Sequence, residues 1–226
     1  YDTLRFQSNE SGRLELSLNI ACPGITPSMR ALLPLDERNL ILKAAQMLRE
    51  HTGCQLGVSI ELSKSIPLQA GLGGGSSDAA ATLVALNHFW KLGLPSRELH
   101  ELAASLGSDV NFFIDSVPLA ICRGRGEQIT PEPLAQPLHF VLIKPPGGLS
   151  TREVFQALQP DRSPRGTARI RQALRSGNLS GIGAQLHNSL EVPAGELSEE
   201  VASALAALRR TSSVGRLMTG SGSSCF

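Results

Sequence analysis

The chain has 226 residues, 41% hydrophobic and 18% charged, which is enough for one large domain or two smaller ones with a real core. Its 21 basic and 20 acidic residues leave a net charge of +1, which excludes a broad electrostatic field for nucleic acid or an anionic membrane. Its longest apolar runs, such as 138–143, fall far short of the roughly 20 residues that a membrane span needs. Any anion site must therefore be local.

The first half of the chain alternates predicted strands and helices. Strands at 3–7 and 13–20 predict a hairpin, because Leu14, Leu16, Leu18 and Ile20 alternate with polar residues. The next predicted elements are a helix at 38–51 that stops at Gly53, a strand at 56–62, a helix at 77–92 with Leu83, Leu86, Phe89 and Trp90 as its apolar stripe, and a helix at 97–106 that stops at Gly107.

The second half begins with predicted strands and continues with helices. Strands are expected at 112–121 and 138–143, and a hairpin turn at Arg123 and Arg125, where solvated charges are a better interpretation than an RNA or phosphate contact. Ser150 and Glu153 have the spacing of a capping box before a helix at 154–158. Helices are expected through 167–210 and a strand at 215–219. A composition shift at Lys144 suggests domains at 1–144 and 145–226.

The cysteines and histidines lack the spacing of a disulfide framework or a metal site. The histidines form no i,i+3 or i,i+4 pair, which argues against a zinc site on one helix, so we predict no metal ligands among them. We also expect reduced thiols and a cytoplasmic location, because no CxxC pair is present among Cys22, Cys54, Cys122 and Cys225. The strand pattern is already under way at Tyr1, and a glycine-serine turn stands just before Phe226. We therefore expect the natural chain to extend beyond both ends.

The richest chemical signal is the glycine-rich segment, residues 67–78, between a predicted strand and a predicted helix. Its glycines let backbone N–H groups approach phosphate oxygens, and the N-terminus of the following helix attracts the same anion. Ser76 and Ser77 can cap the helix, donate to phosphate or help to hold magnesium. The alternative, a flexible linker, is disfavoured by the patterned flanks. The sequence of this segment matches neither the Walker A motif nor the GxGxxG motif.

The glycine-rich segment also resembles the central motif of the GHMP kinases. Further segments are similar to that family in the same order along the chain: Lys64-Ser-Ile-Pro, AGLGGGSSDAAA, LDERNLILKAA, LGSDV with Phe112 and Phe113, KPPGGLST, HNSLE and MTGSGSSCF. The spelling is most similar to the branch whose acceptor is 4-diphosphocytidyl-2-C-methyl-D-erythritol, in the non-mevalonate (MEP) isoprenoid pathway. The resemblance spans nearly the whole chain.

The resemblance implies an α+β fold with two lobes and a nucleotide in the cleft between them. The N-terminal lobe would be like ribosomal protein S5 domain 2, and the C-terminal lobe would be ferredoxin-like. The implied reaction transfers the γ-phosphoryl group of ATP, with Mg²⁺, to the C2 hydroxyl of the acceptor. The implied ATP-binding residues are Pro67, Leu68, Gln69, Ala70, Gly71, Leu72, Gly73, Gly74, Gly75, Ser76, Ser77, Asn39 and Lys64.

Asp109 is the predicted catalytic carboxylate, and it would also contact the acceptor, as would Thr151. A carboxylate can accept or orient the proton of the attacking hydroxyl. Turn preferences alone favour a turn-capping role for Asp109, and the resemblance reverses that preference. As alternatives, Thr151 could cap a helix and Lys64 could be solvated. The family's catalytic lysine, an asparagine and a GYH-like segment are expected before Tyr1. Asn111 stands where many relatives have proline.

Two rival functions remain open at this point. The chain could be another GHMP kinase, of the mevalonate or homoserine type, or a nucleotide-binding module without catalysis. In every case we expect a small-molecule ligand, no nucleic-acid or membrane partner, and a monomer or weak homodimer. The glycine-serine turn at 220–224 is predicted to fold back beside the glycine-rich segment, the alternative being a disordered tail.

Overall fold

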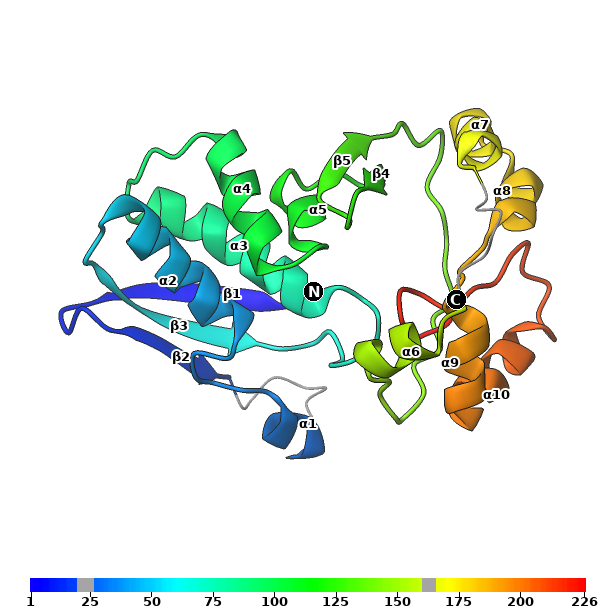
Figure 1. Ribbon diagram of the computed structural model, residues 1–226, viewed down its shortest axis with the longest axis horizontal. Coiled ribbons are helices and arrows are strands. Elements are labelled where there is room, and N and C mark those ends of the chain that lie inside the picture. Colours follow the sequence, from blue (N-terminus) through cyan, green and yellow to red (C-terminus); the bar gives the residue numbers. More distant parts are fainter. Residues whose placement is uncertain (20–26, 160–165) are drawn as a thin grey trace. The chain divides into compact units, whose positions relative to one another are not determined.

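The computed structural model describes residues 1–19, 27–159 and 166–226, in two compact units (Figure 1). Unit 1 comprises Tyr1–Leu68 and Gly73–Pro131, and unit 2 comprises Gln69–Leu72 and Glu132–Phe226. The glycine-rich segment thus contributes four residues to unit 2 and the rest to unit 1. These two units do not test the predicted family domains at 1–144 and 145–226, which stay a prediction.

Unit 1 is built on a three-stranded sheet in the order β1-β3-β2. Strand β3 (Gly57–Ser63) runs antiparallel to β1 (Thr3–Asn9) and parallel to β2 (Leu14–Leu18). The predicted hairpin is wrong, because β3 lies between the two strands that the hairpin would have paired. Gly57 makes this possible: a Cβ there would lie 2.1 Å from the Asn9 side chain and 2.8 Å from the Gly12 backbone. Ile20 and Cys22 lie outside the described residues.

Helices α2 (Leu40–Thr52) and α3 (Gly74–Phe89) cover one face of this sheet, and α4 (Ser96–Leu106) and α5 (Val110–Ile114) pack on them (Figure 1). The short helix α1 (Pro27–Leu32) lies away from this group (Figure 1). The core forms where Val58, Ile60 and Leu62 of β3 meet buried side chains of α2, α3 and α4. Gly53 adopts the left-handed conformation that ends α2, as predicted, and Gly107 caps α4. These helices fix the end of β3 and the start of α3, where the glycine-rich segment lies.

The predicted strand at 112–121 is wrong in its first half, which is helix α5. Val110 and Ile114 are both buried, and their spacing of four residues matches one helical turn rather than a strand. Only Ala120–Arg123 forms a strand, β4, which pairs antiparallel with β5 (Gln128–Pro131). The predicted hairpin at Arg123 and Arg125 is therefore confirmed. Along α3, Phe89 was also placed wrongly in the apolar stripe, since its side chain is exposed.

Unit 2 packs short helices around a second core. The helices are α6 (Thr151–Ala157), α7 (Ala168–Ser176), α8 (Leu179–Gln185), α9 (Glu191–Leu197) and α10 (Glu199–Leu208). Val154, Val201 and Met218 are fully buried in this core. The predicted strands at 138–143 and 215–219 are wrong as regular strands, because within the described ranges they make only isolated bridges from Ile143 and Met218 to Cys225. Both bridges meet at one residue, and Val141 is exposed.

Candidate active site

The start of α3 presents the unit 1 part of the glycine-rich segment. The helix begins at Gly74, three residues earlier than predicted, because Gly73 adopts a left-handed conformation with φ of 66°. A Cβ on Gly73 would lie 2.8 Å from Cζ of Phe113. Gly75 is exposed, whereas Gly74 is buried. The first N–H groups of a helix have no intrahelical partner, so this helix end can receive an anion.

The two serines differ in how far the fold uses them. The Ser77 hydroxyl donates to the Gly74 carbonyl at 2.8 Å, and the Ser77 N–H donates to the Gly73 carbonyl at 2.8 Å. Ser77 is therefore committed to the first turn of α3. Ser76 is half-buried next to the exposed Gly75. Its hydroxyl is the better placed of the two to meet a ligand at the helix end.

Lys64 lies below the start of α3, in a buried cluster with Asp2 and Asp78. Its ammonium nitrogen is 2.8 Å from Oδ2 of Asp78 and also donates to Oδ2 of Asp2. The other oxygen of Asp2 accepts from the N–H groups of Ser65 at 2.6 Å and Ile66 at 2.8 Å. Lys64 is only 2% exposed, so the alternative that it is solvated is wrong. This Lys64 cluster ties the start of β1 and the end of β3 to the first turns of α3.

The two carboxylates of the Lys64 cluster titrate differently because they share one ammonium. Burial alone would raise the pKa of Asp2, but the bonds from Lys64 and from the Ile66 and Ser65 N–H groups hold that pKa below its ordinary value. Burial raises the pKa of Asp78 to about 6 against the attraction of Lys64, and the charge of Asp2 adds to the rise. Sequence reasoning missed both carboxylates as partners of Lys64. The Asp78 that closes GGGSSD was the available signal.

Asp109 occupies the N-cap position of α5 but makes no capping hydrogen bond through its side chain, and it is exposed. The predicted alternative, that it serves as a cap, is therefore wrong. Asp109 lies one helical turn before Phe113, which contacts Gly73 at the start of α3. Its charge also reaches β4, since burial and then Asp109 raise the pKa of the Cys122 thiol. The Asp109 carboxylate is therefore accessible to a ligand from solvent.

Asn111 and Asn39 are used by the fold itself. Asn111 is buried, and its Oδ1 lies 2.7 Å from Nδ1 of His100, which joins α5 to α4. Asn39 caps α2: its Oδ1 accepts from the Ile41 N–H at 2.9 Å, and its amide donates to the Pro34 carbonyl at 2.7 Å. Asn39 is also buried. Its side chain therefore holds the start of α2.

The unit 2 part of the glycine-rich segment lies against the terminal turn, residues 218–224. The Ser224 N–H donates to the Ala70 carbonyl at 3.1 Å, and the Thr219 hydroxyl donates to the Gly71 carbonyl at 2.9 Å. A Cβ on Gly71 would lie 2.3 Å from the Thr219 carbonyl oxygen. The prediction that the closing glycine-serine turn folds back beside the glycine-rich segment is confirmed.

Thr151 is exposed at the first residue of α6, and its hydroxyl is 2.8 Å from the hydroxyl of Ser221 in the terminal turn. Helix capping is performed by the residue before it, since the Ser150 hydroxyl accepts from the Glu153 N–H at 3.4 Å. The capping alternative for Thr151 is therefore wrong. Thr151 and the terminal turn form one polar surface of unit 2.

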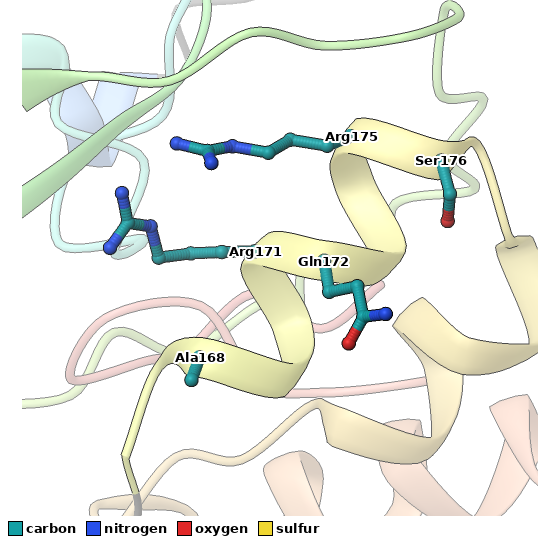
Figure 2. A pocket seen from close by; sticks show the side chains of 5 residues that line it. All are labelled: Ala168, Arg171, Gln172, Arg175 and Ser176. Atoms are coloured by element: carbon teal, nitrogen blue, oxygen red, sulfur yellow. The ribbon is translucent and has the colours of Figure 1, made fainter.

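A separate pocket of about 440 Å³ lies along α7 and contains none of the predicted site residues (Figure 2). Its arginines, Arg171 and Arg175, extend from the same side of the helix (Figure 2). Both pair with the buried Glu132, Arg175 at 2.8 Å. Burial would raise the pKa of Glu132, but the two guanidinium groups hold it below its ordinary value. The pocket is therefore an ion-paired surface of unit 2, and no predicted catalytic group opens into it.

Comparisons with known proteins agree with this geometry. Residues 39–122 match the family model described as GHMP kinases N terminal domain, a range that contains the start of α3 and Asp109. A 4-diphosphocytidyl-2-C-methyl-D-erythritol kinase of Pelotomaculum thermopropionicum is 40% identical, over 100% of this chain and 76% of the relative. The same kinase of Polaromonas naphthalenivorans is 39% identical, over 100% and 72%. The chain belongs to the 4-diphosphocytidyl-2-C-methyl-D-erythritol kinases, within the GHMP kinases.

Solved structures support the same assignment. A crystal structure of 4-(cytidine 5'-diphospho)-2C-methyl-D-erythritol kinase matches with a TM-score of 0.75 and 34% identity, over 99% of this chain and 75% of that one. The mevalonate kinase of L. major, at 18% identity and a TM-score of 0.68, shares the fold alone. The predicted α+β GHMP kinase fold is confirmed. Within the described part of the C-terminal region, its strands are reduced to the bridges at Cys225.

The structure also bears on the predictions for the thiols, for membrane-spanning helices and for groups of metal-ligating side chains. Cys54, Cys122 and Cys225 are free thiols, and Cys22 lies outside the described residues. Over residues 1–19, 27–159 and 166–226, no helix is long and apolar enough to cross a bilayer. In the same ranges, no three His, Cys, Asp or Glu side chains gather as a metal site.

Proposed function

We propose that this kinase transfers the γ-phosphoryl group of ATP to the C2 hydroxyl of 4-diphosphocytidyl-2-C-methyl-D-erythritol, a step of the MEP isoprenoid pathway. The observation that carries the proposal is the pairing, in unit 1, of a glycine-rich helix start with an exposed carboxylate. Phe113 contacts Gly73 and follows Asp109 by one helical turn. A phosphate at the helix start and a base near it are the two parts that phosphoryl transfer needs.

The phosphates of ATP would bind the first turn of α3. The N–H groups of Gly74, Gly75 and Ser76 lack intrahelical partners there, and the helix dipole adds about 0.3–1 kcal/mol for a nearby anion. The exposure of Gly75 supports access. The remaining predicted ATP-binding residues of the segment, 67–73 and Ser77, would shape the loop. Asn39 and Lys64 would act by holding α2 and α3 in place, since their side chains already bond to the fold.

Asp109 would accept or orient the proton of the C2 hydroxyl. As that oxygen bonds to the γ-phosphorus, the bond to the β-phosphate oxygen breaks, ADP leaves, and the proton passes to the Asp109 carboxylate. The exposed carboxylate without a capping bond supports this role. Thr151, exposed beside the terminal turn, would contact the acceptor.

Magnesium, when bound, would neutralise charge on the transferring phosphates. Mg²⁺ commonly takes most of its ligands from substrate phosphates and water, so a dedicated acidic cage is not required. Ser76 is the residue that would hold it, because the Ser77 hydroxyl is bonded to Gly74. We also place this reaction in the cytoplasm, in a monomer or weak homodimer without a nucleic-acid or membrane partner. The net charge of +1 supports the latter point.

The test is an acceptor panel with the full-length natural protein. ATP consumption would be measured with 4-diphosphocytidyl-2-C-methyl-D-erythritol, mevalonate and homoserine, and the product position would be read by ³¹P and ¹³C NMR. We expect turnover with the first acceptor and a new phosphate ester at C2. Turnover with mevalonate or homoserine alone would overturn the proposed acceptor. ATP binding without turnover on any acceptor would favour a binding module.

A further inference from the structure

The segment His187-Asn-Ser-Leu-Glu191 has no role in the reaction described above. Its side chains nevertheless bond to both the carbonyl and the N–H group of Met218, in the terminal turn. The Asn188 amide donates to the carbonyl oxygens of Met218 at 2.8 Å and Gly220 at 2.7 Å. The Glu191 carboxylate accepts from the Met218 N–H at 2.9 Å. Both backbone groups of Met218 are thus bound by side chains from a segment 27 to 30 residues earlier in the chain.

Asn188 is itself fixed, so it can act as a rigid support. Its Oδ1 accepts from the Leu190 N–H at 2.9 Å, next to the start of α9. Its amide group therefore uses both protons and one acceptor site in this contact, which leaves little freedom to rotate. Met218 is fully buried, so the position of the turn is anchored in the core of unit 2.

The terminal turn in turn supports the Gln69–Leu72 part of the glycine-rich segment. Thr219, next to Met218, donates its hydroxyl to the Gly71 carbonyl, and the Ser224 N–H donates to the Ala70 carbonyl. The contact is tight, since even a methyl group on Gly71 would overlap the Thr219 carbonyl oxygen. A shift of the turn would therefore move the backbone of Ala70 and Gly71.

We propose that Asn188 and Glu191 are positioning residues for nucleotide binding, which set the backbone of Ala70 and Gly71 through the terminal turn. The proposal rests on the proposed function, in which Ala70 and Gly71 belong to the ATP-binding loop. Neither Asn188 nor Glu191 needs to contact a ligand. Their effect should fall on the KM for ATP, and kcat at saturating ATP should stay near the wild-type value, because Asp109 is not part of the turn.

The first test is Asn188→Asp, which keeps the acceptor oxygen but removes both donated hydrogen bonds. We expect the KM for ATP to rise about tenfold, which corresponds to the loss of one to two hydrogen bonds, with a smaller change in the acceptor KM. Amide hydrogen exchange at Ser224, whose N–H bonds to Ala70, should become faster. The matched control is Asn178→Ala, which removes an asparagine cap elsewhere in unit 2, at the Gly181 N–H.

A second pair of variants keeps the test decisive if Asn188→Asp does not fold. Glu191→Gln retains an oxygen that can accept from the Met218 N–H, and Glu191→Leu does not. We expect the KM for ATP to stay near wild type in the first and to rise in the second. The proposal is overturned if both variants match wild type, or if Asn178→Ala raises the KM for ATP as much as Asn188→Asp. An inactive wild type would refute the proposed function, while Ser224 exchange would still test the support of Ala70.

Discussion

The two units hold their parts of the glycine-rich segment by different physical means. In unit 1 the start of α3 is held by the buried Lys64 cluster, in which one ammonium group forms ion pairs with two carboxylates. In unit 2 the Gln69–Leu72 part is held by neutral hydrogen bonds and by a close backbone contact at Gly71. A buried charge cluster responds to the loss of one partner and to pH, whereas a close backbone contact responds to the size of a side chain. Substitutions can separate the two.

The largest effect on stability is expected for Lys64→Met. Without the ammonium, the buried carboxylates of Asp2 and Asp78 would lose the cation that they share, at a cost of about 3–5 kcal/mol. The free energy of unfolding in urea measures this loss. Lys43→Met, on the exposed face of α2, is the matched control and should change that free energy by less than about 0.5 kcal/mol. Equal effects of the two substitutions would show that the Lys64 cluster does not support unit 1.

A slightly smaller effect is expected for Gly71→Ala. The residue has φ of 69°, which disfavours alanine by about 1–2 kcal/mol, and the overlap with Thr219 adds about 1–3 kcal/mol. Gly75→Ala is the control, because its Cβ would meet only Leu40 at 3.7 Å inside a helix. That variant should unfold at the same or a slightly higher urea concentration. If both variants lost stability equally, the contact with the terminal turn would not be limiting.

The smallest effect is a change in pH dependence for Asp78→Asn. Because the pKa of Asp78 is raised to about 6 in the fold, the folded protein holds this proton more tightly than the unfolded chain. The group therefore stabilises the fold fully below about pH 4, and this contribution is lost as the pH rises through 6. Up to about 3 kcal/mol is at stake. Unfolding free energies measured from pH 4 to 7 should fall less in Asp78→Asn than in wild type. Parallel curves would contradict the account of the cluster.

Local features of both units could be predicted from the sequence because neighbouring residues decide them. Gly53 ends α2 by its own conformation, and Ser150 caps α6 through a residue three positions away. The order of the sheet could not be predicted, because it depends on Gly57 passing below a connection some 45 residues earlier. The predicted strands at 138–143 and 215–219 were wrong for a similar reason. An apolar pattern indicates a strand, but it does not show whether a partner strand lies along its whole length.

The candidate site shows the same division. The motifs and their order predicted the return of the terminal turn, which is confirmed. They also predicted the glycine-rich segment and Asp109 as site residues, and these roles stay predictions. The partners of Lys64 were not predicted, since Asp2 is 62 residues away and pairing of buried charges leaves no periodic signal. Likewise, the sequence left open whether Thr151 contacts the acceptor or caps a helix, because a threonine hydroxyl suits both roles.

The most direct test of the proposed phosphoryl transfer is turnover by Asp109→Asn in the full-length natural protein. The substitution keeps the shape of an exposed side chain without a capping bond, so the free energy of unfolding and the KM for ATP should stay near wild type. With 4-diphosphocytidyl-2-C-methyl-D-erythritol as acceptor, kcat should fall about 10²–10⁴-fold. Asp115→Asn, at the other end of α5, is the matched control and should retain turnover. Unchanged kcat in Asp109→Asn would contradict the assignment of this carboxylate to the reaction.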